Sequence, residues 1–180
     1  MVYCFLADGF EEMEAIAPID ILRRADIDVK TVGVTGNTVN GRHGIKVIAD
    51  CSITDILLDS NLEAVVLPGG LPGATNLENC EKVQEAIDFS VENNKFVCAI
   101  CAAPQILGHK GLLCGKRAIA YPGFEKELNG AIISENSVVC DDKFITAKGA
   151  GVAVEFGLEI VAQLKSRDVS DNIKSSIQSK

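Results

Sequence analysis

Short apolar runs alternate along the chain with segments that have the periodicity of helices. The strand-like runs occupy residues 2–7, 29–34, 63–67 and 96–100. Helical spacing predicts helices over residues 8–25, 77–92 and 152–164. In the last of these, one buried face is predicted from Ala153, Phe156, Gly157, Ile160, Val161 and Leu164. Strands that alternate with helices predict an α/β fold with a mostly parallel sheet covered by helices on both faces.

Turn-forming residues place the shorter elements between these segments. Asp8, with Glu11 three residues later, predicts a capping box for the first helix. A hairpin-like excursion is expected before a strand at residues 45–49. Residues 138–140 and 144–147 are predicted to pair across a turn. A short strand at 118–120 and a short helix near 124–128 complete the pattern.

The composition indicates a single compact domain over residues 1–180. Of the 180 residues, 47% are hydrophobic and 23% are charged, which suffices for a core without covalent cross-links. No repeat or linker divides the chain. Residues 166–180 are polar, and we expect a terminal helix or a loose tail there.

The charge and the cysteine content restrict the class of protein. A net charge of −8 without any long basic cluster disfavours binding to nucleic acid or to an anionic membrane. No apolar run approaches the ~20 residues of a membrane span, and the amino terminus lacks the basic region of a signal peptide. The seven cysteines lack a secreted-domain spacing and fit reduced thiols. We therefore expect a cytoplasmic protein.

The most informative residue is Cys101. The apolar run at 96–100 ends on it, and Ala102, Ala103 and Pro104 then open a helix. A strand-to-helix elbow pushes its side chain out of the sheet's carboxyl edge, and a helix start favours a thiolate. We predict that Cys101 is a nucleophile with a lowered pKa. A cysteine that only packs is the alternative.

Cys98 and Cys101 also match the C-x-x-C spacing of redox and zinc sites. On an extended strand their Cα atoms would lie about 10 Å apart, beyond the ~7 Å that a disulfide tolerates. No second such pair completes a metal site. We expect Cys98 to be a core residue and the protein to use neither metal nor cofactor. The run at 149–151 is too fragmentary for a phosphate loop.

A nucleophilic cysteine needs a proton-handling partner and an oxyanion site. Glu14 lies on the apolar face of the first helix, where burial would raise its pKa and keep it protonated, whereas Glu11 and Glu12 can be solvated. Gly69 and Gly70 follow the strand at 63–67 and can present backbone N–H groups to an oxyanion.

Four motifs together resemble those of the ThiJ/PfpI superfamily, most closely the branch that contains the Parkinson-associated protein deglycase. They are DGFEEME at 8–14, LPGG at 67–70, AICAAP at 99–104 and KGAG at 148–151. The resemblance spans the chain and implies a flavodoxin-like sandwich of the class I glutamine amidotransferase type, and a homodimer. It also implies an oxidation-prone nucleophile at Cys101, a protonated Glu14 beside it, and backbone donors at Gly70 and Ala102.

The chain departs from the family pattern in the expected substrate pocket. Tyr121 stands where relatives carry a histidine near the cysteine. A phenol cannot act as a base at neutral pH, so proton transfer must depend on Glu14. His43, beside Arg42, falls near an anion-binding arginine of relatives and either contacts the substrate or lies on a surface loop. We place Tyr121, Gly69 and His43 in the pocket.

The resemblance implies a glyoxalase III-like or deglycase-type enzyme that acts on a small carbonyl substrate, a 2-oxoaldehyde such as methylglyoxal, without glutathione. The alternative is a non-enzymatic redox sensor or chaperone that works through oxidation of Cys101. A thiamine (thiazole monophosphate) biosynthesis label, which some relatives carry, is a further alternative. A Cys-His-Glu amidotransferase or peptidase is disfavoured, because neither His43 nor His109 is placed to serve.

Overall fold

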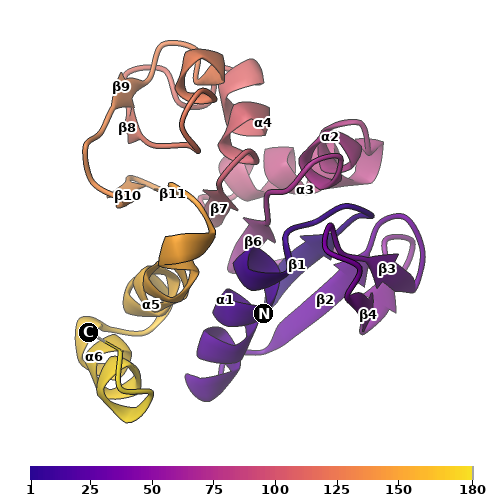
Figure 1. The fold of residues 1–180 in the computed structure, drawn as a ribbon, viewed down its shortest axis with the longest axis horizontal. Helices are drawn as coiled ribbons and strands as arrows, with labels where there is room; N and C mark the ends of the chain where they lie inside the picture. The colour runs from indigo at the N-terminus through magenta and orange to yellow at the C-terminus, as the bar shows by residue number, and fades with distance from the viewer. Residues whose placement is uncertain (180) are drawn as a thin grey trace.

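A seven-stranded sheet forms the centre of the protein, and the computed structural model describes residues 1–179 (Figure 1). The strand order is β10-β11-β7-β6-β1-β2-β5. The strands are β1 (Val2–Leu6), β2 (Val29–Gly33), β5 (Cys51–Ser52), β6 (Ala64–Leu67), β7 (Phe96–Ile100), β10 (Val138–Asp141) and β11 (Phe144–Ala147). Within this sheet, only the pairing of β10 with β11 is antiparallel. The predicted mostly parallel sheet is confirmed.

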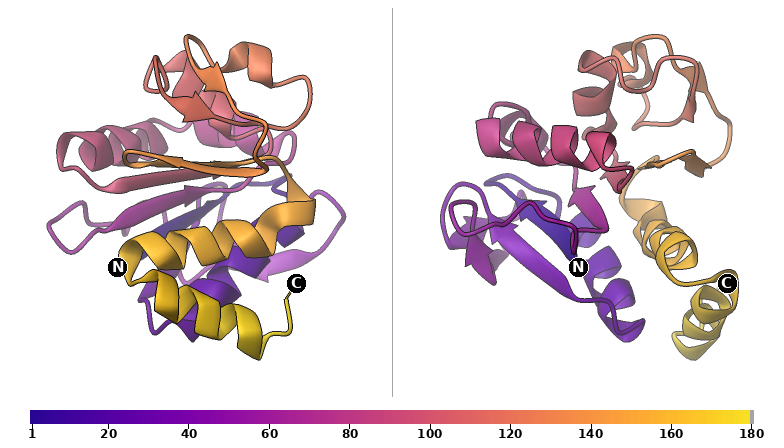
Figure 2. Two further views of the ribbon diagram at one scale, coloured as in Figure 1. Left: turned by 90° about the vertical axis from the view of Figure 1, so that its left-hand side faces the viewer. Right: turned by 180° about the vertical axis from the view of Figure 1, so that it is seen from behind.

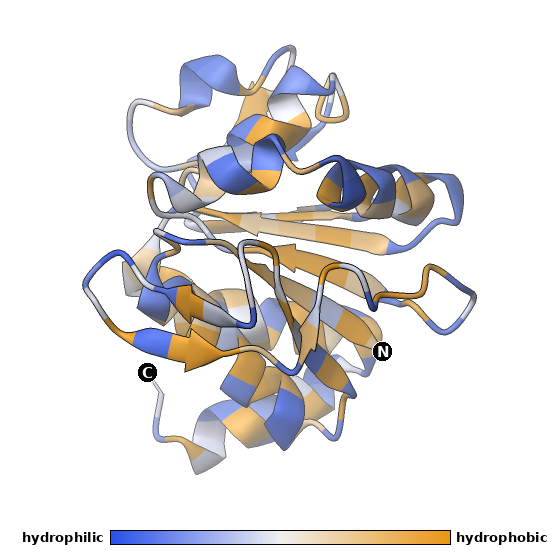
Figure 3. Ribbon diagram, turned by 90° about the vertical axis from the view of Figure 1, so that its right-hand side faces the viewer, coloured by the Kyte–Doolittle hydropathy of each residue, from blue (hydrophilic) through white to orange (hydrophobic). Residues whose placement is uncertain are grey.

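Helices cover both faces of the sheet (Figure 2). One face carries α1 (Glu12–Arg24), α5 (Ala153–Leu164) and α6 (Arg167–Ser176). The other carries α2 (Gly73–Glu78), α3 (Glu81–Glu92) and α4 (Pro104–His109). Apolar residues concentrate along the strands between these layers (Figure 3). Within residues 1–179, no helix combines the length and the apolar character needed to cross a membrane.

Two small sheets lie outside the central one. The predicted excursion is a hairpin of β3 (Thr38–Asn40) and β4 (Lys46–Ile48). Its turn reaches the start of α1, because the Arg42 N–H donates a hydrogen bond to the Phe10 carbonyl at 2.8 Å. The second small sheet pairs β8 (Arg117–Ala118) with β9 (Ile132–Ile133).

Several predicted boundaries were wrong. Asp8 does not cap α1: its carboxylate accepts a hydrogen bond from the Asn40 N–H, and Glu11 is the N-cap. The predicted helix at 77–92 divides into α2 and α3, because Cys80 is extended. Residues 125–127 form only a 3-10 turn, η1 (Glu125–Glu127). β5 and β9 have two residues each, too few for a periodic signal.

The carboxyl-terminal segment folds against the body of the protein through Ser176. Ser166 caps α6 by accepting a hydrogen bond from the Val169 N–H at 3.3 Å. The Ser170 hydroxyl donates to the Leu158 carbonyl, and Ile173 is buried. The helix α6 occupies residues 167–176 of the segment where a terminal helix or a loose tail was expected.

The helix that carries Glu14 packs closely on α5. A Cβ atom at Gly157 would lie only 2.9 Å from Pro18 Cα. Glycine in α5 therefore lets the backbone of α1 approach. This packing holds the first turn of α1 beside the carboxyl end of the sheet.

Candidate active site

Cys101 lies at the carboxyl edge of the sheet, directly after β7. Its φ angle is +65°, in the left-handed region that residues other than glycine rarely adopt. Strained conformations of this kind concentrate at functional positions. The sharp elbow predicted from the sequence is present, although α4 begins only at Pro104, three residues beyond the cysteine.

Glu14 reaches the same place from the first turn of α1. Its side chain is only 1% exposed. The Gly69 N–H donates a hydrogen bond to Oε2 at 3.0 Å, and the Ala150 N–H also donates to this carboxyl group. The carboxyl group hydrogen-bonds the Cys101 side chain as well. The structure thus brings together the predicted nucleophile and its predicted partner.

Gly69 and Gly70 form the backbone beside this pair. A Cβ atom at Gly69 would lie 2.6 Å from Glu14 Oε2 and 2.7 Å from Cys101 Cβ, so no larger residue fits. Gly70 has a φ of +85°, which favours glycine. The N–H groups of Gly70 and Ala102 donate to the Cys101 sulfur. The Gly69 N–H instead donates its hydrogen bond to the Glu14 carboxyl group.

The electrostatics of the pair agree with the sequence for Glu14 and disagree for Cys101. Burial, with the nearby charge of Glu11, raises the pKa of Glu14 to about 7. Burial and the Glu14 carboxylate also raise the pKa of Cys101 to about 12, although the hydrogen bonds from Gly70 and Ala102 act to lower it. The predicted lowering of the Cys101 pKa was wrong, because the thiol is desolvated beside another acid.

Glu14 and Cys101 are neighbouring acids that can share one proton. That proton lies on the Glu14 carboxyl or on the Cys101 thiol, because burial and the neighbouring charge disfavour ionisation of both groups at once. Transfer of that proton from sulfur to carboxylate produces a thiolate without any exchange with solvent. Glu14 therefore can activate Cys101 as a general base.

The raised pKa of Glu14 predicts a pH-dependent stability. Between pH 4.5 and 7 the folded protein keeps a proton that the unfolded chain has released, so the free energy of unfolding falls as pH rises. The fall should reach about 3 kcal/mol. Urea unfolding of the wild type and of Glu14→Gln across this window measures it. A parallel dependence in both proteins would show that Glu14 is not its source.

The pair opens into a surface hollow of about 360 Å³. It is lined by Glu11, Glu14, Arg42, His43, Leu71, Cys101, Ala102, Tyr121, Phe124 and Ala150. Of the predicted pocket residues, Tyr121 and His43 line this hollow. Gly69 lies behind it, against Glu14 and Cys101. The Tyr121 N–H donates to the Cys101 carbonyl at 2.8 Å, which ties this wall to the elbow.

The other acids of the α1 start are not solvated as the sequence suggested. Glu12 is 6% exposed and accepts hydrogen bonds from the His43 and Ile45 N–H groups. His43 Nδ1 lies 2.9 Å from Glu12 Oε2 and 3.8 Å from Glu11 Oε1. Burial of Glu12 is thus compensated by hydrogen bonds, and its pKa is lowered despite desolvation. These three side chains are also close enough together to hold a metal ion.

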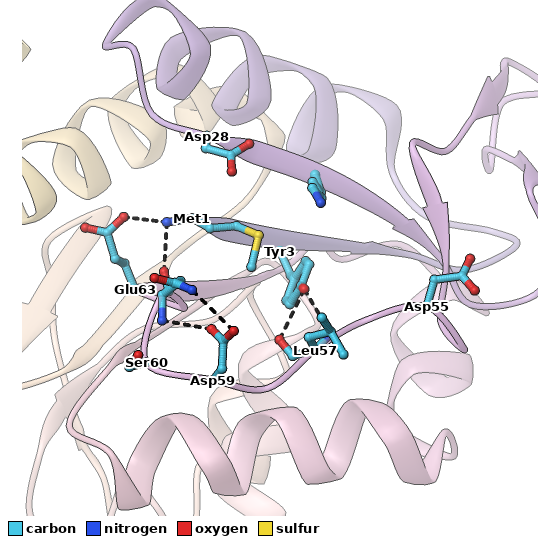
Figure 4. Close-up of a pocket in the computed structure, with 10 residues that line it drawn as sticks. Met1, Tyr3, Asp28, Asp55, Leu57, Asp59, Ser60 and Glu63 are labelled. Carbon is cyan, nitrogen blue, oxygen red and sulfur yellow. Dashed lines mark hydrogen bonds and ion pairs between the residues drawn. The ribbon is translucent and has the colours of Figure 1, made fainter.

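Another, larger hollow lies at the opposite edge of the sheet from this chemistry. It measures about 690 Å³ and is lined by residues that precede β1, β2 and β6, including Met1, Asp28 and Glu63 (Figure 4). Parallel strands place those residues at the edge opposite Cys101. The Tyr3 hydroxyl and the terminal amine there already pair with neighbouring groups. Its lining is chiefly acidic and polar and contains no cysteine.

The remaining histidine and cysteines lie away from the pair. His109 is held between Glu78 and Glu127, at 2.5 and 3.2 Å. Cys98 is fully buried, and burial raises its pKa, as expected for a core residue. Cys114 is exposed, whereas Cys51, Cys80 and Cys140 are partly buried.

Sequence reasoning missed Ala150, Leu71 and Phe124 as parts of the site. The run at 149–151 was judged too fragmentary for a phosphate loop, and KGAG at 148–151 served only as a family motif, yet the Ala150 N–H donates to Glu14. Leu71 directly follows the glycine pair, so its position was a usable signal. Phe124 had none, because the loop at 121–124 has no periodicity.

The chain is similar to known proteins over most of its length. The family model described as the DJ-1/PfpI family matches residues 1–163. Protein DJ-1 homolog A of Arabidopsis thaliana is 38% identical over 94% of this chain, and the chain spans less than half of that protein, 44%. A protein of Caenorhabditis elegans named glutathione-independent glyoxalase DJR-1.2 is 29% identical over 91% of this chain and 87% of its own length.

The fold comparison gives the same family. The structure of Toxoplasma gondii DJ-1 in an oxidised form has a TM-score of 0.94, with 29% identity, and the match covers 99% of this chain and 97% of that one. The predicted flavodoxin-like sandwich is therefore confirmed. The family match covers most of the chain, and the four sequence motifs lie within it. The protein belongs to the DJ-1/PfpI family.

Proposed function

We propose that the protein is a cysteine-dependent, glutathione-independent glyoxalase that acts on small 2-oxoaldehydes such as methylglyoxal. The observation that carries the proposal is the hydrogen-bonded pair of a strained Cys101 and a buried Glu14 at the floor of a hollow. The Caenorhabditis elegans relative, which is named a glutathione-independent glyoxalase, supports the same reaction.

The first step forms a bond between the Cys101 sulfur and the aldehyde carbon. The thiol proton moves to Glu14, and the electron pair of the carbonyl moves to its oxygen. An oxyanion that develops there can accept hydrogen bonds from the Gly70 and Ala102 N–H groups, which already point at the sulfur. Glu14 then returns the proton to this oxygen, so the product is a neutral hemithioacetal and Glu14 is a carboxylate again.

The second step moves hydrogen from the former aldehyde carbon to the neighbouring carbon. Glu14 takes the carbon-bound proton and returns it to the adjacent position, while proton transfer between the oxygens completes the isomerisation to a 2-hydroxy thioester. Water then cleaves the thioester, releases the 2-hydroxy acid and restores the thiol. The balance is one 2-oxoaldehyde and one water to one hydroxy acid.

The test is the conversion of methylglyoxal to lactate by protein freed of metal and assayed without glutathione. Turnover is expected, with stoichiometric lactate measured by an enantiomer-resolving separation. Loss of methylglyoxal without lactate would reflect adduct formation and would contradict the assignment.

A redox sensor is the second candidate, because the same donors that stabilise an oxyanion also stabilise a sulfinate on Cys101. The oxidised structure of the Toxoplasma gondii relative favours this alternative. It requires selective oxidation of Cys101 and no turnover, so the lactate assay separates the candidates.

Tyr121 stands in the position of the family histidine, and its variants test how much this side chain contributes to turnover. It lines the hollow with a half-exposed ring, and its backbone is tied to Cys101. Tyr121→His should raise the rate by up to about 10²-fold, the effect of a positioned acid or base. Tyr121→Phe should lower it if the hydroxyl contacts substrate. Steady-state rates at several pH values measure both.

The wild type serves as the reference for Tyr121, and its rate should follow the ionisation of the Glu14 pair alone. If all three proteins are inactive while Cys101 oxidises selectively, the glyoxalase assignment fails and the sensor replaces it.

We also propose a homodimer. Met13 and Ile16 lie three residues apart on α1 and are 58% and 43% exposed. Ile48 of the hairpin is 79% exposed and lines one hollow together with Ile16. Exposed apolar side chains that adjoin in this way favour contact with another protein surface.

A further inference from the structure

A second hollow adjoins the one that contains Cys101. It measures about 340 Å³ and is lined by Tyr121, Pro122 and the loop at 148–152. Tyr121 and Ala150 line both hollows. The second hollow therefore begins at a residue whose N–H holds the Glu14 carboxyl group.

The lining of this second hollow is chiefly apolar. It combines the rings of Tyr121 and Pro122 with the small residues Gly149, Ala150 and Gly151. A Cβ atom at Gly149 would be 3.3 Å from the Tyr121 ring, whereas a Cβ atom at Gly151 would have no neighbour within 4 Å. The glycines thus leave open space beside an aromatic wall.

Methylglyoxal has too few atoms to use this space. The first hollow, at about 360 Å³, already falls in the range of pockets for much larger ligands. A 2-oxoaldehyde bonded to Cys101 directs its substituent away from the sulfur. A bulky apolar substituent can then pass Tyr121 and lie against the glycines.

We infer that the second hollow is a subsite for the substituent of the substrate, and that the preferred substrates are 2-oxoaldehydes with an aryl or branched alkyl group. The inference rests on the proposed glyoxalase function and adds the substrate class to it. An aromatic substituent gains contact with Tyr121 and Pro122 and is removed from water.

The experiment compares initial rates with phenylglyoxal and methylglyoxal in the wild type, Gly151→Ala and Gly151→Val. The wild type should have a kcat/KM about 10-fold higher for phenylglyoxal, through a lower KM. The added side chains should remove this preference in steps by filling the hollow, so that kcat/KM falls much further for phenylglyoxal than for methylglyoxal. Ser175→Val, on the exposed side of α6, is the matched control.

A measurement without turnover keeps the subsite testable if the protein is not a glyoxalase. Calorimetry should show that mandelate, the product from phenylglyoxal, binds more tightly than lactate, and that Gly151→Val abolishes the difference. Absence of turnover with both aldehydes overturns the proposed function, while the binding result still decides the subsite.

Three results would overturn the subsite. They are equal rates and equal product affinities in the wild type, equal losses for both aldehydes in Gly151→Val, and a changed sedimentation coefficient for that variant. The last result would mean that a second copy of the chain covers the hollow.

Discussion

Glu14→Gln is expected to lower kcat/KM for methylglyoxal by about 10²- to 10⁴-fold, the usual contribution of a general acid or base. Glutamine keeps the length of the side chain and an oxygen for the Gly69 N–H, so the fold should persist. It cannot accept the Cys101 proton or move a proton between carbons. Lactate formation and thermal unfolding, measured on the same preparation, separate these effects.

Glu12→Gln is the matched control for Glu14→Gln. Glu12 lies on the same turn of α1 and is also buried, but its carboxylate faces His43. The Glu12→Gln variant should lower methylglyoxal turnover far less than Glu14→Gln does. Wild-type turnover in Glu14→Gln would exclude Glu14 as the base and favour the redox sensor.

Cys101→Ser is expected to reduce methylglyoxal turnover to the uncatalysed rate, since no other thiol lies beside a general base in this hollow.

In the wild type, mild peroxide should place two oxygen atoms on Cys101 as a sulfinate, with two peroxides reduced to water. The N–H groups of Gly70 and Ala102 stabilise the anion formed. Peptide mass spectrometry after a peroxide series locates the adduct.

Cys114 provides the internal control for the oxidation, because it is exposed and stands outside the Cys101 hollow. Glu14→Asp, which withdraws the carboxyl group from the sulfur, should change the oxidation state that Cys101 reaches. Preferential modification of Cys114, Cys80 or Cys51 would contradict a specialised role for Cys101 and would weaken both the enzyme and the sensor assignments.

The order of elements and the position of the nucleophile were readable from the sequence. Continuous apolar runs mark strands buried on both faces, and the end of such a run at Cys101 marks the carboxyl edge, where ligands bind in parallel sheets. The helical face that carries Glu14 indicated burial, and the structure agrees, with 1% exposure. These features depend on local periodicity, which the chain carries without tertiary contacts.

Short elements and long-range polar contacts could not be predicted in this way. The strands β5 and β9 depend on pairing partners far along the chain. Asp8 and Glu11 compete for one cap, and the contact of Asp8 with Asn40 on the distant hairpin decides between them. Glu12 is buried for the same reason, since the turn of that hairpin supplies its hydrogen bonds.

Only the tertiary structure decided whether the pKa of Cys101 is raised or lowered. A helix start and a proton donor favour a thiolate, as the sequence suggested, but the fold places the thiol in a desolvated position beside an acid that competes for the same charge. Desolvation depends on everything that surrounds a group, including the Ala150 loop and Tyr121. The sequence therefore determined which residues could react, and the packing of distant segments decided how their protons are shared.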